Sequence, residues 1–285
     1  MYVLHCPCIK NPALRADGIT RPDDLALFRR CIERCDRFGI EMVPLPCPET
    51  MYLGAGRAPG TFLERLDTPE FARLMDTLEA RVTRIIEERG APLALVGVNS
   101  SPTCGVTSTY YGSRGTEPPK RDGRGVFFAR FPHIRAIDVA SFARYRVYLA
   151  APLFSEAERQ YNLMVAHVLM ENFFDIFLPQ ENGDISAARN GQAHEQIYRA
   201  NMRAIESADL VVAVIDGADA DSGTAWEMGY ATAMGKPVIA LRTDFRQIGH
   251  EELVNLMLER SATVVRDKDA LLQALSGHLI GQPGA

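Results

Sequence analysis

The segment 216–227, DGADADSGTAWE, is rich in small residues and carboxylates. Its small residues let the backbone N–H groups of a helix start face a ligand. The positive end of that helix favours an ionised Glu227, which we place in the first helical turn. An ionised carboxylate beside a sugar can attack the anomeric carbon and leave a covalent glycosyl-enzyme. The segment therefore predicts a nucleophile at Glu227.

A structural role for the same side chains stays open. Thr224 and Glu227 have the spacing of a capping box, in which the glutamate only bonds the backbone at the helix start. Asp221 fits an ordinary loop acid, and Asn201 fits a residue on a helix surface. The residues alone do not decide between capping and catalysis.

The cysteines form a second group with chemical potential. All six lie within the first 104 residues, and in a reducing compartment they favour metal binding or burial over disulfides. Cys8, Cys47 and Cys104 each follow a predicted strand, so a parallel sheet would bring them to one edge. Three thiolates leave one position of a metal open for substrate. Cys6 should point away from Cys8 in an extended chain, and we expect a structural role for it.

The elements that position Glu227 follow from hydrophobic periodicity. The run LVVAVI at 210–215 is typical of a strand buried on both faces. Strands and helices alternate through the second half, which predicts a doubly wound, flavodoxin-like five-stranded parallel sheet with its ligand at the carboxyl ends of the strands. The expected strands are 145–150, 174–178, 210–215, 237–241 and 262–265, and the expected helices begin at 155, 194, 224, 251 and 268.

The first half predicts a smaller α/β domain. Strands are expected at 1–5, 40–45 and 93–98, with helices opening at Pro22 and covering 69–89. Residues 105–135 are rich in Gly, Pro, Arg and Tyr and show little periodicity. We therefore divide the chain into two domains, residues 1–135 and residues 144–285.

Composition excludes several classes of protein. The net charge is −5 without a basic stripe, which argues against a nucleic-acid polymer as partner. No stretch approaches the roughly 20 apolar residues of a membrane span, and the N-terminus lacks the pattern of a signal peptide. We expect a cytoplasmic protein that acts on a small molecule.

The second half resembles the nucleoside 2-deoxyribosyltransferase family. The resemblance lies in VYLAAPLFSEAE (147–158), IYRANMRAIESADLVVAVIDG (197–217) and DSGTAWEMGYATAMGKPVIA (221–240). It implies a transferase or hydrolase of nucleosides without a cofactor in this half, and a homo-oligomer in which a neighbour completes the pocket. The implied catalytic residues are Glu227, Asp221 and Asn201, and the implied substrate-binding residues are Tyr148, Pro152, Phe154, Ser222 and Gly223.

Two positions depart from that family. Ala151 stands where many members have Gly, which narrows the loop. Asn201, where some transferases have Asp, cannot donate a proton as an acid does, so base preference stays open. Ser222 offers a hydroxyl to a 5′-phosphate, whereas the charge of Asp221 argues against one.

The first half resembles the thiouracil desulfidase family. The segments are CIKNPALRADG (8–18), CPE (47–49), SPTCG (101–105) and GRGVF (123–127). The resemblance implies a [4Fe–4S] cluster on Cys8, Cys47 and Cys104 whose open iron takes sulfur from a thiolated base. It also implies roles in proton transfer and substrate binding for Glu49 and Ser101. The Cys-Pro-Cys loop with Asn11-Pro12 is unlike typical members and indicates a divergent branch.

Together these patterns predict an enzyme that breaks or transfers the N-glycosidic bond of (2-deoxy)nucleosides, fused to an iron–sulfur desulfidase domain. The fusion suits nucleoside salvage or the clearing of modified bases. Two alternatives stay open: a nucleoside 5′-monophosphate N-glycosidase, and a module that binds or senses a nucleotide without turning it over.

Overall fold

The computed structural model describes residues 1–112, 119–182, 191–246 and 253–281. The chain forms two compact units. Unit 1 comprises Met1–Ala143 and His278–Ala285, and unit 2 comprises Arg144–Gly277. Within the described ranges, every helix is too short or too polar to cross a membrane.

Unit 2 is built on a five-stranded parallel sheet, as predicted. The strand order is β11-β10-β9-β7-β8, so the first strand along the chain lies between the second and the third. In register, Val147 of β7 pairs with Leu210 of β9, and Val211 of β9 pairs with Val238 of β10. All five residues of β9 are buried, which explains its continuous apolar run. The strands are β7 (Arg146–Ala150), β8 (Asp175–Phe177), β9 (Leu210–Val214), β10 (Val238–Leu241) and β11 (Thr263–Val265).

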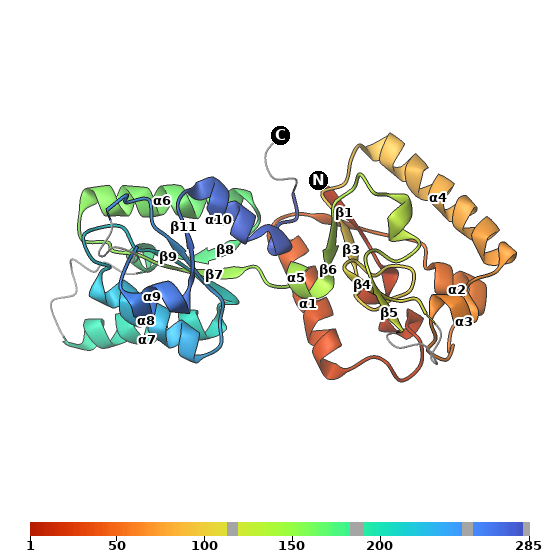
Figure 1. Ribbon diagram of the computed structural model, residues 1–285, viewed down its shortest axis with the longest axis horizontal. Coiled ribbons are helices and arrows are strands. Elements are labelled where there is room, and N and C mark those ends of the chain that lie inside the picture. Colours follow the sequence, from red (N-terminus) through yellow and green to blue (C-terminus); the bar gives the residue numbers. More distant parts are fainter. Residues whose placement is uncertain (113–118, 183–190, 247–252, 282–285) are drawn as a thin grey trace. The chain divides into compact units, whose positions relative to one another are not determined.

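Helices cover both faces of this sheet, with α6 and α10 on one side and α7, α8 and α9 on the other (Figure 1). The sequence indicates where two of these helices begin, because Ser155 and Glu158 form a capping box at α6 and Asp267 caps α10. The helices are α6 (Glu156–Glu171), α7 (Gly191–Ser207), α8 (Ser222–Ala233), α9 (Leu256–Ser261) and α10 (Lys268–Ala274), with the short 3-10 turns η4 (Pro179–Glu181) and η5 (Ser276–His278). The expected helix start at 251 and the loop residues 183–184 lie outside the described residues.

Unit 1 repeats the same strand arrangement on a smaller scale. Its parallel sheet has the order β2-β1-β3-β6. In Figure 1, α1 and α5 lie on one side of this sheet and α4 on the other. The strands are β1 (Tyr2–His5), β2 (Glu41–Pro44), β3 (Leu95–Gly97) and β6 (Ala136–Asp138), and the helices are α1 (Pro22–Arg37), α2 (Pro48–Leu53), α3 (Phe62–Arg65), α4 (Pro69–Arg89) and α5 (Val139–Phe142).

Periodicity does not predict the remaining elements of unit 1, because they are only three residues long. An antiparallel hairpin, β4 (Ser108–Tyr110) with β5 (Lys120–Asp122), lies within the irregular stretch after β3. Three 3-10 turns, η1 (Pro7–Ile9), η2 (Pro12–Leu14) and η3 (Phe128–Arg130), complete the unit.

Candidate active sites

Glu227 lies on α8, whose first residue is Ser222. It is therefore the sixth residue of the helix and lies in the second turn, not in the first as expected. The capping box is also absent from this helix. Asp221 caps α8 instead, because its Oδ2 accepts hydrogen bonds from the backbone N of Thr224 at 3.0 Å and from its Oγ1 at 3.4 Å.

The Glu227 side chain is directed at the sheet. The buried Tyr148 hydroxyl, on β7, donates a hydrogen bond to Glu227 Oε1. The Tyr148 ring stacks on Phe177 of β8, with 5.5 Å between the ring centroids and 12° between the planes. Two strands of the sheet thus hold the donor that orients the Glu227 carboxylate.

Burial shifts the pKa of the Glu227 carboxyl group. It raises the pKa of Glu227 to about 7, and the nearby Asp221 charge adds to the rise, while the Tyr148 hydrogen bond opposes it. Burial and the Glu227 charge also raise the pKa of Tyr148. The helix dipole therefore favours the ionised form less than the sequence predicted, because it acts mainly within the first turn and Glu227 is both buried and one turn further along.

The other predicted residues of unit 2, apart from Asn201, lie in the loop after β7 or at the start of α8. Pro152 follows β7, and its carbonyl oxygen accepts a 2.8 Å hydrogen bond from the buried Asn162 Nδ2. Phe154, which also follows β7, is 72% exposed. A Cβ atom added at Gly223 would lie 3.1 Å from Asp221 Oδ2, which leaves little room for a side chain there. Ser222 is exposed at the first position of α8.

Asn201 lies half-buried on α7, a helix that packs against α8. Among the described residues, no hydrogen bond joins its side chain to Glu227 or Tyr148. Sequence reasoning missed Asn162, which also donates to Gln180 Oε1 at 3.0 Å and so ties the loop after β7 to the loop after β8. An asparagine within a helical pattern gives no signal of such a role.

In unit 1, Cys8, Cys47 and Cys104 line one cavity of about 720 Å³ together with Glu49 and Ser101. Cys8 lies in η1 after β1, Cys47 precedes α2 after β2, and Cys104 follows β3. The carboxyl ends of parallel strands meet at one edge, which brings these segments together. In the part of the chain that the structure describes, no three His, Cys, Asp or Glu side chains converge on a position for a single metal ion.

Cys6 belongs to the same cavity, contrary to expectation. The chain turns into η1 directly after Cys6 and is not extended there. The Cys6 thiol is buried; burial first, and the neighbouring thiols of Cys104 and Cys8 second, raise the pKa of Cys6. Cys31 and Cys35, by contrast, are buried within α1.

Hydrogen bonds to Ser101 and to the segment 125–127 hold the loop that carries Cys104, residues 101–105. Ser101 Oγ accepts hydrogen bonds from the backbone N of Cys104 at 3.1 Å and of Thr103 at 3.3 Å. On the other side, the backbone N of Gly125 donates to Gly105 O and that of Phe127 donates to Thr103 O. A Cβ atom at Gly125 would lie 2.4 Å from the Thr103 carbonyl carbon, so the segment 123–127 requires glycine at this point.

Glu49 connects the loops that carry Cys47 and Cys104. Its Oε1 accepts hydrogen bonds from Ser101 Oγ at 3.0 Å and Thr103 Oγ1 at 2.9 Å, and its Oε2 lies 3.1 Å from Arg57 Nη2. Sequence reasoning predicted Glu49 and Ser101 but missed Thr103 and Arg57. Arg57 lies in a loop rich in Gly and Pro, where an arginine is normally solvated, so the sequence carries no signal of its burial.

Comparisons with known proteins match the two halves of the chain to different families. Residues 147–266 match the family model of nucleoside 2-deoxyribosyltransferase, and residues 6–130 match the family described as "Putative 2-thiouracil desulfurase". An uncharacterized protein of Ureaplasma parvum serovar 3 is 31% identical over 129 residues, which cover 40% of this chain and 80% of the relative.

Similar solved structures include a conserved protein from Enterococcus faecalis V583, which is 31% identical with a TM-score of 0.41 and covers 47% of this chain and 99% of its own. A 2-deoxyribosyltransferase from Bacillus psychrosaccharolyticus is 26% identical with a TM-score of 0.38 and covers 43% and 86%. By the family-model matches, residues 147–266 form a nucleoside 2-deoxyribosyltransferase-like enzyme domain, and residues 6–130 form a domain similar to the family described as "Putative 2-thiouracil desulfurase".

Proposed function

We propose that unit 2 breaks the N-glycosidic bond of a (2-deoxy)nucleoside through a covalent intermediate on Glu227. The observation that carries this proposal is the Glu227 carboxyl group directed at Tyr148 on the sheet and not bonded to its own helix start. The ionised Oε attacks C1′ while the base leaves with the electron pair of the glycosidic bond and takes up a proton. A second base or water then attacks C1′ and releases Glu227.

The remaining residues receive supporting roles in this proposal. Tyr148 orients Glu227, while Asp221 holds the sugar or assists proton transfer at the base. Asn201 faces the base, and as an amide it is not an acid. The substrate-binding residues are Pro152, Phe154, Ser222 and Gly223, which follow β7 or begin α8.

One assay separates the candidate activities. The enzyme is incubated with a 2′-deoxynucleoside, with and without a different free base. We expect a new deoxynucleoside when the second base is present, which indicates a transferase. Release of free base in water alone would indicate a hydrolase, and turnover restricted to 5′-monophosphates would indicate the nucleotide N-glycosidase. Tight binding without any product would contradict the enzyme and favour a sensing module.

For unit 1 we propose a desulfidase acting on thiolated bases, with a [4Fe–4S] cluster held by Cys8, Cys47 and Cys104. The donor set supports this cofactor, because the three thiols line one cavity and iron–sulfur clusters are held by cysteine thiolates. A cluster spreads its iron atoms apart, so its ligands do not need to converge as those of one ion do. When bound, the cluster supplies an iron that accepts sulfur from the substrate. Ser101 and Glu49 lie within 3.0 Å of each other and can bind the base and move a proton at the carboxylate.

The cluster is tested by anaerobic purification. We expect a brown protein whose charge-transfer absorbance is lost in Cys104→Ser. A colourless, iron-free preparation of the wild-type protein would contradict the cluster. The chemistry requires reduced thiols, which supports a cytoplasmic location.

We further propose a homo-oligomer. Unit 2 exposes the ring of Trp226, which stacks on Tyr230 with 5.4 Å between centroids and lies 6.4 Å from Tyr198. Trp226 is 50% exposed and Tyr198 is 52% exposed. Such aromatic clusters are enriched at interfaces. Light scattering on the purified chain should give a mass above that of one copy, and the monomer mass would contradict the proposal.

A further inference from the structure

Arg57 is a buried cation in the loop between α2 and α3 of unit 1. The whole residue is only 7% exposed, although nothing in the loop sequence calls for burial. Burying a guanidinium is unfavourable unless it is paired and hydrogen-bonded. The partners of Arg57 therefore indicate why it lies inside.

The Arg57 guanidinium group donates hydrogen bonds on two sides. Nη2 and Nε donate to Glu49 Oε2, at 3.1 Å and 3.4 Å. Nη1 donates to the carbonyl oxygen of Leu14 at 2.8 Å and to Thr50 Oγ1 at 3.0 Å. The Arg57 backbone also takes part, because its carbonyl oxygen accepts a 2.8 Å hydrogen bond from the N of Asp17.

These partners belong to two cysteine-bearing segments, and one of them, Glu49, contacts a third. Leu14 ends η2, which follows Cys8. Thr50 lies in α2, and its Oγ1 is 3.1 Å from the sulfur of Cys47. Glu49 in turn accepts the hydroxyl hydrogen bonds of Ser101 and Thr103, the residues that precede Cys104. Arg57 thus connects the Cys8 and Cys47 loops directly, and it connects the Cys104 loop through Glu49.

We propose that Arg57 is a positioning residue that holds the Cys8, Cys47 and Cys104 loops together at the spacing the cavity requires. The planar fork of arginine suits this task, because it reaches partners on two sides at fixed angles, which the single ammonium of lysine does not. The inference rests on the proposed iron–sulfur function of unit 1, but its first test needs no iron.

The test measures the alkylation rate of each cysteine by mass spectrometry in the full-length chain prepared without iron. In Arg57→Gln we expect Cys8, Cys47 and Cys104 to react at least about tenfold faster than in the wild-type chain, because the ties between their loops are gone. Cys31 and Cys35 are internal standards within α1 and should keep their rates. Equal acceleration of all cysteines would indicate general destabilisation and overturn the proposal, as would unchanged rates.

Arg130→Gln is the matched control. Arg130 also pairs with carboxylates of unit 1, Asp76 at 2.7 Å and Glu79 at 2.5 Å, but it does not line the cysteine cavity. This variant should leave the rates of Cys8, Cys47 and Cys104 as they are in the wild-type chain. If it accelerates them as much as Arg57→Gln does, the role assigned to Arg57 is wrong.

Arg57→Lys separates the two ends of the fork. Lysine keeps a charge for Glu49 but cannot also reach Leu14, so Cys8 should become reactive while Cys104 stays protected. Equal protection of both thiols in this variant would contradict the need for the guanidinium fork.

Iron retention then separates this inference from the proposed function. After anaerobic reconstitution and a chelator challenge, Arg57→Gln should lose iron about 10–100-fold faster than the wild-type chain, the range for residues that support metal ligands. A wild-type chain that binds no iron would contradict the cluster and leave the alkylation result to decide the role of Arg57. A wild-type chain that binds iron no more firmly than the variant would contradict the positioning role alone.

Discussion

At the scale of single residues, the Glu227 carboxyl group is governed by its surroundings more than by its place on a helix. Burial and the Asp221 charge favour the protonated form, and the Tyr148 hydrogen bond favours the ionised form. A nucleophile must be ionised to attack, so the free enzyme has a mixed population near neutral pH. Tyr148 therefore has two effects, since it orients the carboxylate and stabilises its charge.

Replacing the nucleophile should abolish turnover. Glu227→Gln keeps the shape of the side chain, but its amide cannot form the glycosyl ester, so we expect kcat to fall by about 10⁴-fold or more. Glu171→Gln, at the exposed end of α6, should retain wild-type activity. Base release from a deoxynucleoside, followed by chromatography, measures both. Near-normal activity of Glu227→Gln would show that another group performs the attack.

The pH dependence follows from the pKa of Glu227 of about 7. As the pH falls through this value the carboxylate takes up a proton, so kcat/KM of the free enzyme should decline with a single ionisation. Tyr148→Phe removes a hydrogen bond that stabilises the charged form, which should move the inflection to higher pH. An inflection that stays in place or moves to lower pH in Tyr148→Phe would contradict this account.

The sequence marks these residues and their contacts to different degrees. Glu227, Cys8, Cys47 and Cys104 could be chosen because motifs or strand ends mark them. Tyr148 could be named as a pocket residue, but its bond to Glu227 depends on the pairing of β7 with β9, which brings separate parts of the chain together. The position of Cys6 could not be predicted, because the turn of η1 decides the direction of its side chain.

At the scale of elements, the first residues of α8 affect both the stability of the protein and the ionisation of Glu227. Asp221 caps the helix and also raises the pKa of Glu227. Asp221→Asn should keep the cap, because asparagine also accepts the N–H hydrogen bond, whereas Asp221→Ala should lose about 1 kcal/mol of unfolding free energy. Both variants remove the charge and should move the inflection of kcat/KM to lower pH. Denaturant unfolding and a pH profile measure the two effects, and equal stability loss in both variants would contradict the cap.

The approach of the segment 123–127 to the Cys104 loop gives a second prediction for an element. In Gly125→Ala the new methyl group would meet backbone atoms, the Thr103 carbonyl carbon at 2.4 Å and the Cys104 N at 2.7 Å, which cannot rotate away. We expect a loss of about 1–3 kcal/mol of stability, as for other overpacked sites. Gly229→Ala on α8 is the control, because a Cβ there meets nothing within 4 Å. Equal unfolding midpoints for the two variants would count against the close approach.

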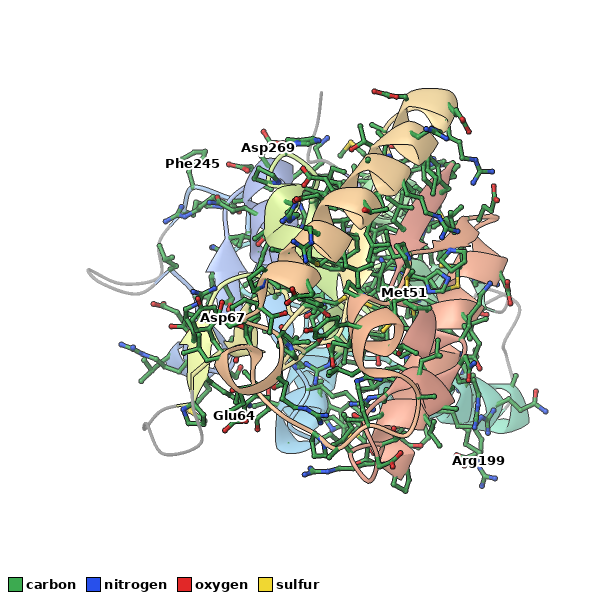
Figure 2. All side chains as sticks on the ribbon, turned by 90° about the vertical axis from the view of Figure 1, so that its right-hand side faces the viewer. Met51, Glu64, Asp67, Arg199, Phe245 and Asp269 are labelled. Carbon is green, nitrogen blue, oxygen red and sulfur yellow. The ribbon has the colours of Figure 1, made fainter. Side chains whose placement is uncertain are left out.

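Elements differ in how much of them the sequence reveals. The central strands of unit 2, β7, β9 and β10, were predictable because buried parallel strands leave continuous apolar runs. The hairpin of β4 and β5 was not, since three-residue strands exposed on one side leave no periodic pattern. The segment after β10 gave no signal either. It carries Phe245, which is 88% exposed and projects from the ribbon in Figure 2.

At the scale of the whole molecule, both units use the same strand order in a parallel sheet, and the residues that we propose as reactive lie on segments that follow its strands. The segment from His278 onward belongs to unit 1, where Leu279 and Ile280 are buried. Arg34 donates hydrogen bonds to the carbonyl oxygens of Phe142 and His278. The division into functional domains at 1–135 and 144–285 stays a proposal. Each unit has its own core, so we expect two separate sites.

This separation predicts independent losses of function. Cys104→Ser should remove iron without changing the rate of base release, and Glu227→Gln should stop base release without changing the iron content. The two measurements are made on the same preparations of each variant. A variant that removes both functions while its unfolding midpoint stays at the wild-type value would show that the sites are coupled.

The central claim is tested most directly by trapping the covalent intermediate. The enzyme is mixed with a 2′-deoxynucleoside, quenched in acid and digested, and the peptides are searched for a deoxyribosyl ester. We predict this adduct on the peptide that contains Glu227, and its absence in Glu227→Gln. Rapid turnover with an unmodified Glu227 peptide, retained in the Glu227→Gln variant, would contradict the mechanism.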